Sequence, residues 1–126
     1  MKEDKILKIA ENLAGAIWEN PFSDGDNTII LRHGKGGKWF GALINAPRRS
    51  LALAGEGYVR VLNVKCEPML AAMLIQNYRD IFPAYHMNKT HWISLLLDGA
   101  LPEEEFEKLL NLSYALTLPK ARRKFD

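Results

Sequence analysis

The sequence predicts an α+β domain in which one antiparallel sheet carries its helices on one face. Three observations predict this fold. Apolar residues recur at helical spacing in three segments, strand-like runs lie between those segments, and short turns join the strands. Strands joined by hairpins form antiparallel sheets, which commonly pack helices against one face. We expect a two-layer sandwich with the order α-β-β-β-α-β-β-α, as a single domain over residues 1–126.

The first helix is expected over residues 5–18. Its apolar residues recur every three or four positions and make one stripe, which comprises Ile6, Ile9, Ala10, Leu13, Ala16 and Ile17. The Asn20-Pro21 pair is expected to end it, because the residue before a proline is pushed out of the helical region. Residues 23–27 then form a loop by composition.

Three strands are expected next, over residues 28–33, 38–44 and 58–64. The first two are separated by a turn that contains Gly34, Gly36 and Gly37. Phosphate-binding glycine loops open a helix, whereas these glycines lie between strands, so a hairpin turn is the favoured interpretation. The segment between the second and third strands is expected to be irregular, with a short extended piece around residues 50–54.

The second helix is expected to start at Pro68, because proline suits the first helical position, and to end near Asp80. Two short strands are expected after it, over residues 83–87 and 91–97. A turn at residues 88–90 joins them, which predicts a second hairpin.

The last helix is expected to open at Pro102. Three glutamates follow this proline, and they are better explained by the positive end of the helix dipole than by acid–base chemistry. We expect the helix to break at residues 111–113. The basic segment 119–126 is expected to be a frayed tail.

The composition is that of one ordinary globular domain. The chain has 126 residues, of which 48% are hydrophobic and 25% charged, so it can bury a core without disulfides. Its one cysteine, Cys66, fits a buried thiol in a reducing compartment. No apolar run approaches the ~20 residues that a membrane span needs, and the charged N-terminal segment is unlike a signal peptide. We therefore expect a cytoplasmic protein.

No catalytic or metal site can be assembled from the sequence. His86 and His91 flank one turn, but a metal ion would need a third ligand and the turn offers none. Cys66 precedes a helix start, yet no base lies near it in the sequence. We expect a protein that is not an enzyme and that uses no metal and no small-molecule cofactor.

Strand alternation predicts which side chains face away from the helices. The purer aliphatic sets, Val59 and Val61 among them, are expected to face the helices. The uncovered face would then carry Tyr58, Trp92, Leu62, Arg32 and Arg60. A homodimer interface is the favoured interpretation of this patch. The alternatives are a stacking platform for nucleic acid, coverage by residues 45–57, and a wrong assignment of the faces.

The charge balance permits nucleic-acid binding without arguing for it. The net charge is +2 and the pI is about 8.7, which is less basic than a dedicated duplex-DNA binder usually is. Outside the tail, the basic residues of interest are Lys35, Lys38, Arg48, Arg49 and Lys89. Solvated surface is the simpler interpretation of these side chains, and contact with a phosphate backbone is the functional one.

Distinctive strings in the second half of the chain carry a family resemblance. PAYHMNKTHW spans residues 83–92 and is followed by ISLLLDG and LPEEEFEKLLNLSYALT. Together with Cys66-Glu67-Pro68 and with Tyr78-Arg79, these strings make the chain resemble the MmcQ/YjbR family over nearly its whole length.

The resemblance implies a fold similar to that of the secretion chaperones, a two-layer sandwich with one antiparallel sheet. Members of the family are often described as DNA-binding proteins with a double-wing arrangement of hairpins, so the resemblance implies DNA binding and brings no catalytic residue. The matched positions are Asn88, Lys89, His91, Trp92, Ser113 and Tyr114.

Two roles remain open for this motif. In a structural role, Asn88 closes a turn, Lys89 projects into solvent at its tip, and the hydroxyls of Ser113 and Tyr114 bind buried backbone. In a functional role, the loop residues contact a ligand.

We therefore expect a DNA-binding protein that is not an enzyme. The residues expected to bind nucleic acid are Lys35, Lys38, Arg48, Arg49, Lys89 and His91. The first five of these are expected to line one surface. The alternative is a protein-interaction or chaperone-like module that forms a homodimer through the uncovered face, with Tyr58, Arg60 and Trp92 at the interface.

Overall fold

A computed structural model of the chain describes residues 1–22 and 27–119. Most of the loop expected at residues 23–27, and the tail from residue 120 onward, therefore lie outside the described residues. The elements in chain order are α1 (Glu3–Glu11), β1 (Ala16–Glu19), β2 (Ile29–His33), β3 (Trp39–Pro47), the 3₁₀ helix η1 (Arg48–Leu51), β4 (Tyr58–Lys65), α2 (Pro68–Asn77), β5 (Ile81–Pro83), β6 (Trp92–Leu96) and α3 (Glu103–Leu116). Among the described residues, no helix is both long and apolar enough to cross a membrane.

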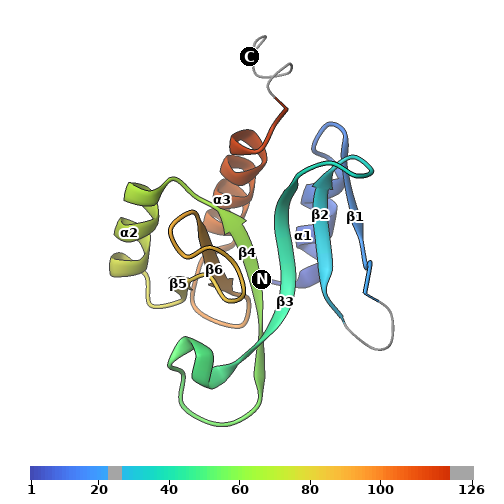
Figure 1. The fold of residues 1–126 in the computed structure, drawn as a ribbon. Coiled ribbons are helices and arrows are strands. Elements are labelled where there is room, and N and C mark those ends of the chain that lie inside the picture. The colour runs from blue at the N-terminus through green and yellow to red at the C-terminus, as the bar shows by residue number, and fades with distance from the viewer. Residues whose placement is uncertain (23–26, 120–126) are drawn as a thin grey trace.

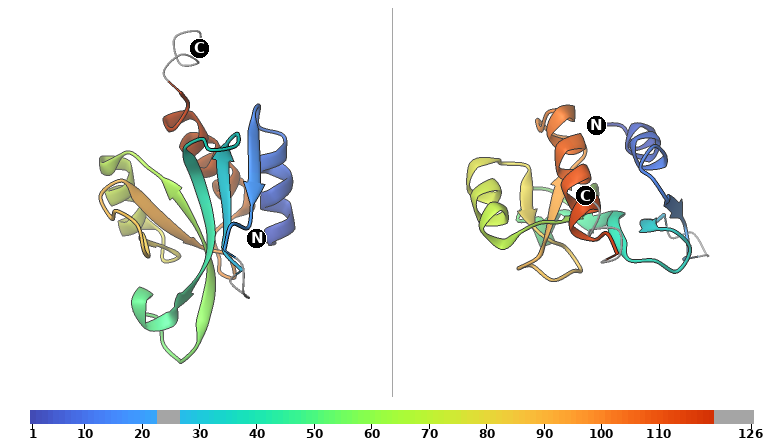
Figure 2. Two further views of the ribbon diagram at one scale, coloured as in Figure 1. Left: turned by 45° about the vertical axis from the view of Figure 1, so that its right-hand side comes forward. Right: turned by 90° about the horizontal axis from the view of Figure 1, so that it is seen from above.

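The six strands form one sheet in the order β1-β2-β3-β4-β6-β5, and every neighbouring pair is antiparallel (Figure 1). Helices α1 and α3 lie on the same side of this sheet, which we call the inner face, and α2 lies beside the β5 edge (Figure 2). The predicted α+β class with a single antiparallel sheet is thus confirmed.

The N-terminal helix is shorter than predicted, and the chain gains a strand. Helix α1 ends at Glu11, and Gly15 adopts a left-handed conformation with φ 73° that turns the chain back. Residues 16–19 then pair with β2 as the edge strand β1, in which Trp18 lies opposite Leu31. The apolar spacing at Ile17 suggested a helix, but the β-branched and aromatic residues after Gly15 gain more from pairing with the sheet.

The second half also departs from the prediction at its boundaries. Helix α2 ends at Asn77, and the strand expected over residues 83–87 is replaced by β5 (Ile81–Pro83) and a loop over residues 84–91. The extended piece expected near residues 50–54 is replaced by η1. Helix α3 is continuous, so the break expected at residues 111–113 is wrong.

The main core lies between the inner face and the helices. Its largest buried members include Ile6, Leu31, Phe40, Leu43, Leu62, Val64, Leu95, Phe106 and Leu110. The hydroxyl of Ser113 in α3 donates a hydrogen bond to the carbonyl of Phe40 at 2.6 Å and accepts one from the N–H of Lys65 at 2.8 Å. The structural role predicted for Ser113 is therefore confirmed, although the hydroxyl acts from within a continuous helix. The Tyr114 hydroxyl likewise donates to the carbonyl of Ala14.

The opposite side of the sheet, the outer face, carries a smaller core. It is built from Ala46, Leu51, Val61 and Leu96, against which pack Ile44, Leu53, Val59, Phe82 and Tyr85. The face assignment made for β4 is therefore wrong, because Val59 and Val61 point outward while Leu62 points to the helices. Both residue sets of β4 are aliphatic at the centre, so alternation alone does not separate them. The segment after β3 covers part of the outer face, as one of the alternatives held.

Candidate nucleic-acid interface

A groove of about 690 Å³ opens between the β3–β4 loop and the corner where α2 leads into β5. Its apolar and aromatic lining residues are Leu51, Leu53, Ile75, Tyr78, Ile81, Phe82 and Pro83. Its basic lining comes from Arg49, Arg79 and Lys89. We call this feature the basic groove.

Two hairpin loops bring their charges to this groove. Arg49 lies in η1, at the start of the β3–β4 loop (residues 48–57), and Lys89 lies in the β5–β6 loop (residues 84–91). Arg79 lies in the short link between α2 and β5. Arg49 and Lys89 are forty positions apart in the sequence. They line one surface only because the sheet places β4, β6 and β5 side by side.

No described acidic residue lines the basic groove, and among the described carboxylates none forms an ion pair with Arg49, Arg79 or Lys89. Asp80 is the nearest carboxylate in sequence, but its Oδ2 accepts a hydrogen bond from the N–H of Ala100 at 2.6 Å. The groove therefore presents three cations that form no ion pair with a described carboxylate, although Glu56 borders an adjoining pocket with Arg49, and this charge favours an anionic ligand.

The sequence predicted that Lys89 projects into solvent from the tip of a turn, and the structure shows otherwise. Its Nζ donates a hydrogen bond to the carbonyl of Ala84 at 2.7 Å, so the side chain folds back along its own loop. An ammonium group has three donors, and two of them remain for a ligand. The predicted direction of the Lys89 side chain is therefore wrong, but its charge still lies at the basic groove.

Asn88 builds the loop that holds Lys89. Its Oδ1 accepts hydrogen bonds from the N–H groups of Thr90 at 2.8 Å and His91 at 3.1 Å. This confirms the predicted turn-closing role of its side chain. The left-handed residue of the loop is His86, with φ 61°, and its ring packs against that of Tyr85 in a tilted arrangement with a centroid distance of 4.1 Å. Among the described residues, no group of three or more His, Cys, Asp or Glu side chains could hold a metal ion.

His91 and Arg48 contribute mainly to the loops themselves. The carbonyl of His91 accepts a hydrogen bond from the N–H of Cys66 at 2.8 Å, while its side chain is exposed. The Arg48 guanidinium donates to the carbonyl of Ala54 at 3.2 Å and braces the β3–β4 loop. Neither residue lines the basic groove.

Cys66 is buried beside the start of α2. Burial raises the pKa of its thiol above the ordinary value, and the nearby Glu67 carboxylate raises that pKa further. A raised pKa disfavours the thiolate, so this geometry agrees with the predicted structural role.

Lys35 and Lys38 lie far from the groove. Both are exposed in the β2–β3 turn, at the opposite end of β3 from η1 (Figure 1). Nine strand residues separate the two ends, which corresponds to about 30 Å. The prediction that these lysines share one surface with Arg49 and Lys89 is therefore wrong. Gly34 and Gly36 adopt φ values of 75° and 74°, which confirms the predicted hairpin turn.

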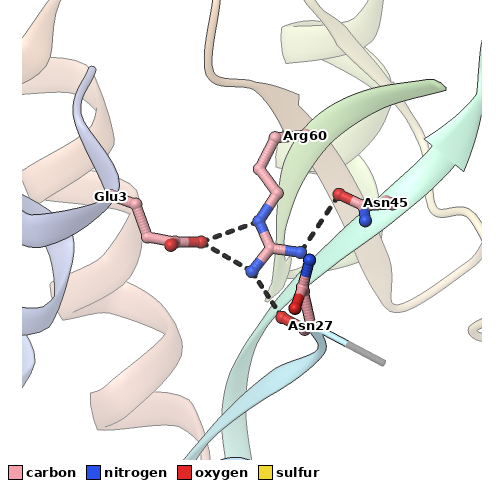
Figure 3. A network of polar contacts seen from close by, with 4 residues as sticks. All are labelled: Glu3, Asn27, Asn45 and Arg60. Atoms are coloured by element: carbon pink, nitrogen blue, oxygen red, sulfur yellow. Dashed lines mark hydrogen bonds and ion pairs between the residues drawn. The ribbon is translucent and has the colours of Figure 1, made fainter. Parts of the chain in front are cut away.

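Arg60 is committed to a structural network and does not form an interface patch (Figure 3). Its Nε and Nη2 contact Oε1 of Glu3 in α1 at 2.7 Å and 2.6 Å. Its other hydrogen bonds reach Asn45 Oδ1 at 3.1 Å and the carbonyl of Asn27 at 2.6 Å. Arg60 therefore ties α1 to the inner face of the sheet, which corrects its predicted place on the uncovered face.

Tyr58 and Trp92 are likewise not assembled into one patch. Tyr58 is 70% exposed at the start of β4 and shares its side of the strand with Arg60. Trp92 is half-buried and pairs with Lys65, so it lies on the opposite side of the sheet from Tyr58 and Arg60. Arg32 is paired with Glu19 at 2.6 Å. The prediction that these side chains form one patch on the uncovered face is therefore wrong.

Comparison with known proteins identifies the family of this chain. The family model described as YjbR matches residues 11–116. The chain belongs to the YjbR family. It is 35% identical to the Bacillus subtilis protein YyaQ over 117 residues, which cover 93% of this chain and 98% of YyaQ. It is 38% identical to Escherichia coli YjbR over 66 residues, or 50% of this chain and 56% of that protein.

The fold agrees with a solved structure of similar sequence. A Pseudomonas syringae protein of known crystal structure superposes with a TM-score of 0.84 at 30% identity, covering 94% of this chain and all of the other. The predicted family resemblance is thus confirmed. Sequence reasoning on this YjbR chain missed Arg79 as a site residue. The signal available for it was the Tyr78-Arg79 pair, which stands between the end of a helix and the next strand.

Proposed function

We propose that this YjbR-family chain binds DNA through the basic groove and catalyses no reaction. The observation that carries the proposal is the convergence of Arg49 and Lys89, from two different hairpin loops, with Arg79 on one groove. The β3–β4 and β5–β6 loops would be the two wings of a double-wing arrangement. Each wing would supply one cation to the phosphate backbone, and Arg79 would lie between them.

The physical case rests on charge that no described carboxylate offsets. Binding a phosphate backbone releases condensed counterions, so affinity falls with salt in proportion to the number of phosphates that are neutralised. The three cations of the groove would give a slope of log affinity against log salt of about −2 to −3. This is a weak dependence of affinity on salt, and it agrees with the low net charge of +2.

The test compares cations in the groove with a cation outside it. Arg49→Gln, Arg79→Gln and Lys89→Gln should each weaken DNA binding and reduce the salt slope by about 1. Lys35→Gln removes an equal charge from the distant β2–β3 turn and should leave the slope nearly unchanged. Fluorescence anisotropy with labelled DNA, at several salt concentrations, measures both quantities. The absence of binding by the unaltered protein at low salt would contradict the proposal.

Self-association is a second candidate, favoured by the composition of α2. This helix contains no charged residue, and its Met69 and Met73 are 76% and 58% exposed. Exposed apolar side chains on a helix commonly mark an interface, so the side of α2 that carries these two methionines suits a protein partner. We expect light scattering to give a dimer that Met73→Glu disrupts. A monomer at high protein concentration would contradict this candidate and leave DNA binding untouched.

A further inference from the structure

The basic groove combines two chemistries that a duplex does not require together. Its cations suit phosphates, but much of its lining is apolar and includes the half-buried residues Tyr78 and Phe82. A duplex presents phosphates and base edges at its surface while its base faces are stacked inside. Docking a duplex here would place hydrated phosphates over apolar side chains and would leave those side chains without a matching partner.

An unpaired base supplies the missing partner. Every base has an apolar π-face, and bases in single strands stack on aromatic side chains without a strong sequence preference. Tyr78 directly follows α2 and Phe82 lies in β5, so two aromatic residues four positions apart line the same groove as Arg79. The volume of about 690 Å³ falls within the range of about 300–1,000 Å³ typical of ligand sites.

The distribution of the other cations points the same way. Lys35 and Lys38 are about 30 Å from η1 along β3, so they add no phosphate contacts to the groove. Arg32 and Arg60 are held by Glu19 and Glu3. None of these four cations extends the positive charge of the groove, and a short run of charge suits a few nucleotides better than a long duplex face.

We infer that the groove binds a short single-stranded stretch of nucleic acid, with bases against Tyr78 and Phe82 and phosphates at Arg49, Arg79 and Lys89. This inference rests on the proposed function and narrows it to a substrate class. The shared chemistry, an aromatic base joined to a phosphate, is also that of a free nucleotide, and the experiment separates the two.

The experiment compares ligands that differ in one feature. Anisotropy titrations use a labelled oligothymidylate of about ten nucleotides, an abasic strand of the same length, the corresponding duplex, and thymidine monophosphate as competitor. The single strand should bind about tenfold more tightly than the abasic strand, which carries the same phosphates without bases. It should also bind more tightly than the duplex, and the monophosphate should compete only weakly.

A variant pair locates the effect. Phe82→Leu keeps an apolar side chain and should lower the affinity for the single strand several-fold, while the affinity for the abasic strand stays the same. Phe22→Leu changes an aromatic residue that is 45% exposed outside the groove and should change neither affinity. Thermal unfolding shows whether each variant is folded. Should Phe82→Leu unfold, Tyr78→Leu replaces it with the same expectation.

The outcomes separate this inference from the proposed function. Equal binding of the abasic strand or the duplex would overturn the single-strand inference and leave DNA binding standing. Equal binding of the monophosphate would make the groove a nucleotide site and would also overturn the inference. No binding of any DNA would overturn both.

Discussion

The two faces of the sheet are covered by different kinds of structure. Helices α1 and α3 seal the inner face, where Ser113 satisfies the backbone of two strands at once. The outer face is covered only in part, by side chains from two hairpin loops. Helices close a face because their backbone groups are paired internally, whereas loops reach it with single side chains and leave hollows between them. The stability of this chain should therefore be concentrated on the inner face, and ligand binding on the outer one.

The largest expected effect comes from cutting a cavity in each core. Phe106→Ala on the inner face should lower the free energy of unfolding by about 3–5 kcal/mol, because Phe106 is 1% exposed within the main core. Leu51→Ala on the outer face should cost nearer about 2 kcal/mol, because a loop can collapse into the space. Urea denaturation measures both values. Equal losses would show that the two faces are equally rigid.

A smaller effect is expected from the polar group that joins the inner layers. Ser113→Ala leaves the carbonyl of Phe40 and the N–H of Lys65 buried without this partner, which should cost about 1–3 kcal/mol. Ser50→Ala, at an exposed hydroxyl beside the basic groove, should stay within about 0.5 kcal/mol of the unaltered protein. Equal losses of stability in urea for the two serine variants would contradict the expectation that the Ser113 hydroxyl stabilises the inner face.

The smallest effect is expected at the exposed rim of the helical layer. The hydrogen bond from Lys5 lowers the pKa of Glu103, so the pair adds stability above the ordinary carboxyl pKa of about 4.3. That contribution is lost as the pH falls through the lowered pKa. Glu103→Gln should therefore lower the melting temperature slightly at neutral pH and not at acid pH. Glu104→Gln is the control, and a deficit that persists at low pH would argue against the ion pair.

Sequence pattern predicted the outline of the fold, because the informative positions act locally. Pro68 and Pro102 mark helix starts, and the glycines after His33 mark a hairpin, whatever the rest of the chain does. The pattern failed where tertiary pairing decides. Ile17 continues a helical stripe yet lies in β1, and β4 has aliphatic residues on both sides.

The site was predictable only in part, for the same reason. Arg49 and Lys89 were recognisable as basic loop residues, but nothing local says that their loops meet. Their meeting depends on the order β4-β6-β5, which places the β5–β6 hairpin beside β4. Arg79 lay at the end of the predicted second helix and in the Tyr78-Arg79 pair of the family resemblance, but neither says which surface it faces, so only the structure places it in the groove.

The hydroxyl of Ser113 has a consequence for how the chain folds. Its hydrogen bond to Phe40 joins residues 73 positions apart, and the bond from Tyr114 to Ala14 spans 100 positions. Contacts this distant slow folding, because a long stretch of chain must be ordered before they form. As the protein is synthesised from its N-terminus, β3 and β4 are complete well before α3 exists. The part of the inner face that α3 covers stays open to water until residues 103–116 arrive, and exposed apolar surface of this kind favours aggregation during that interval.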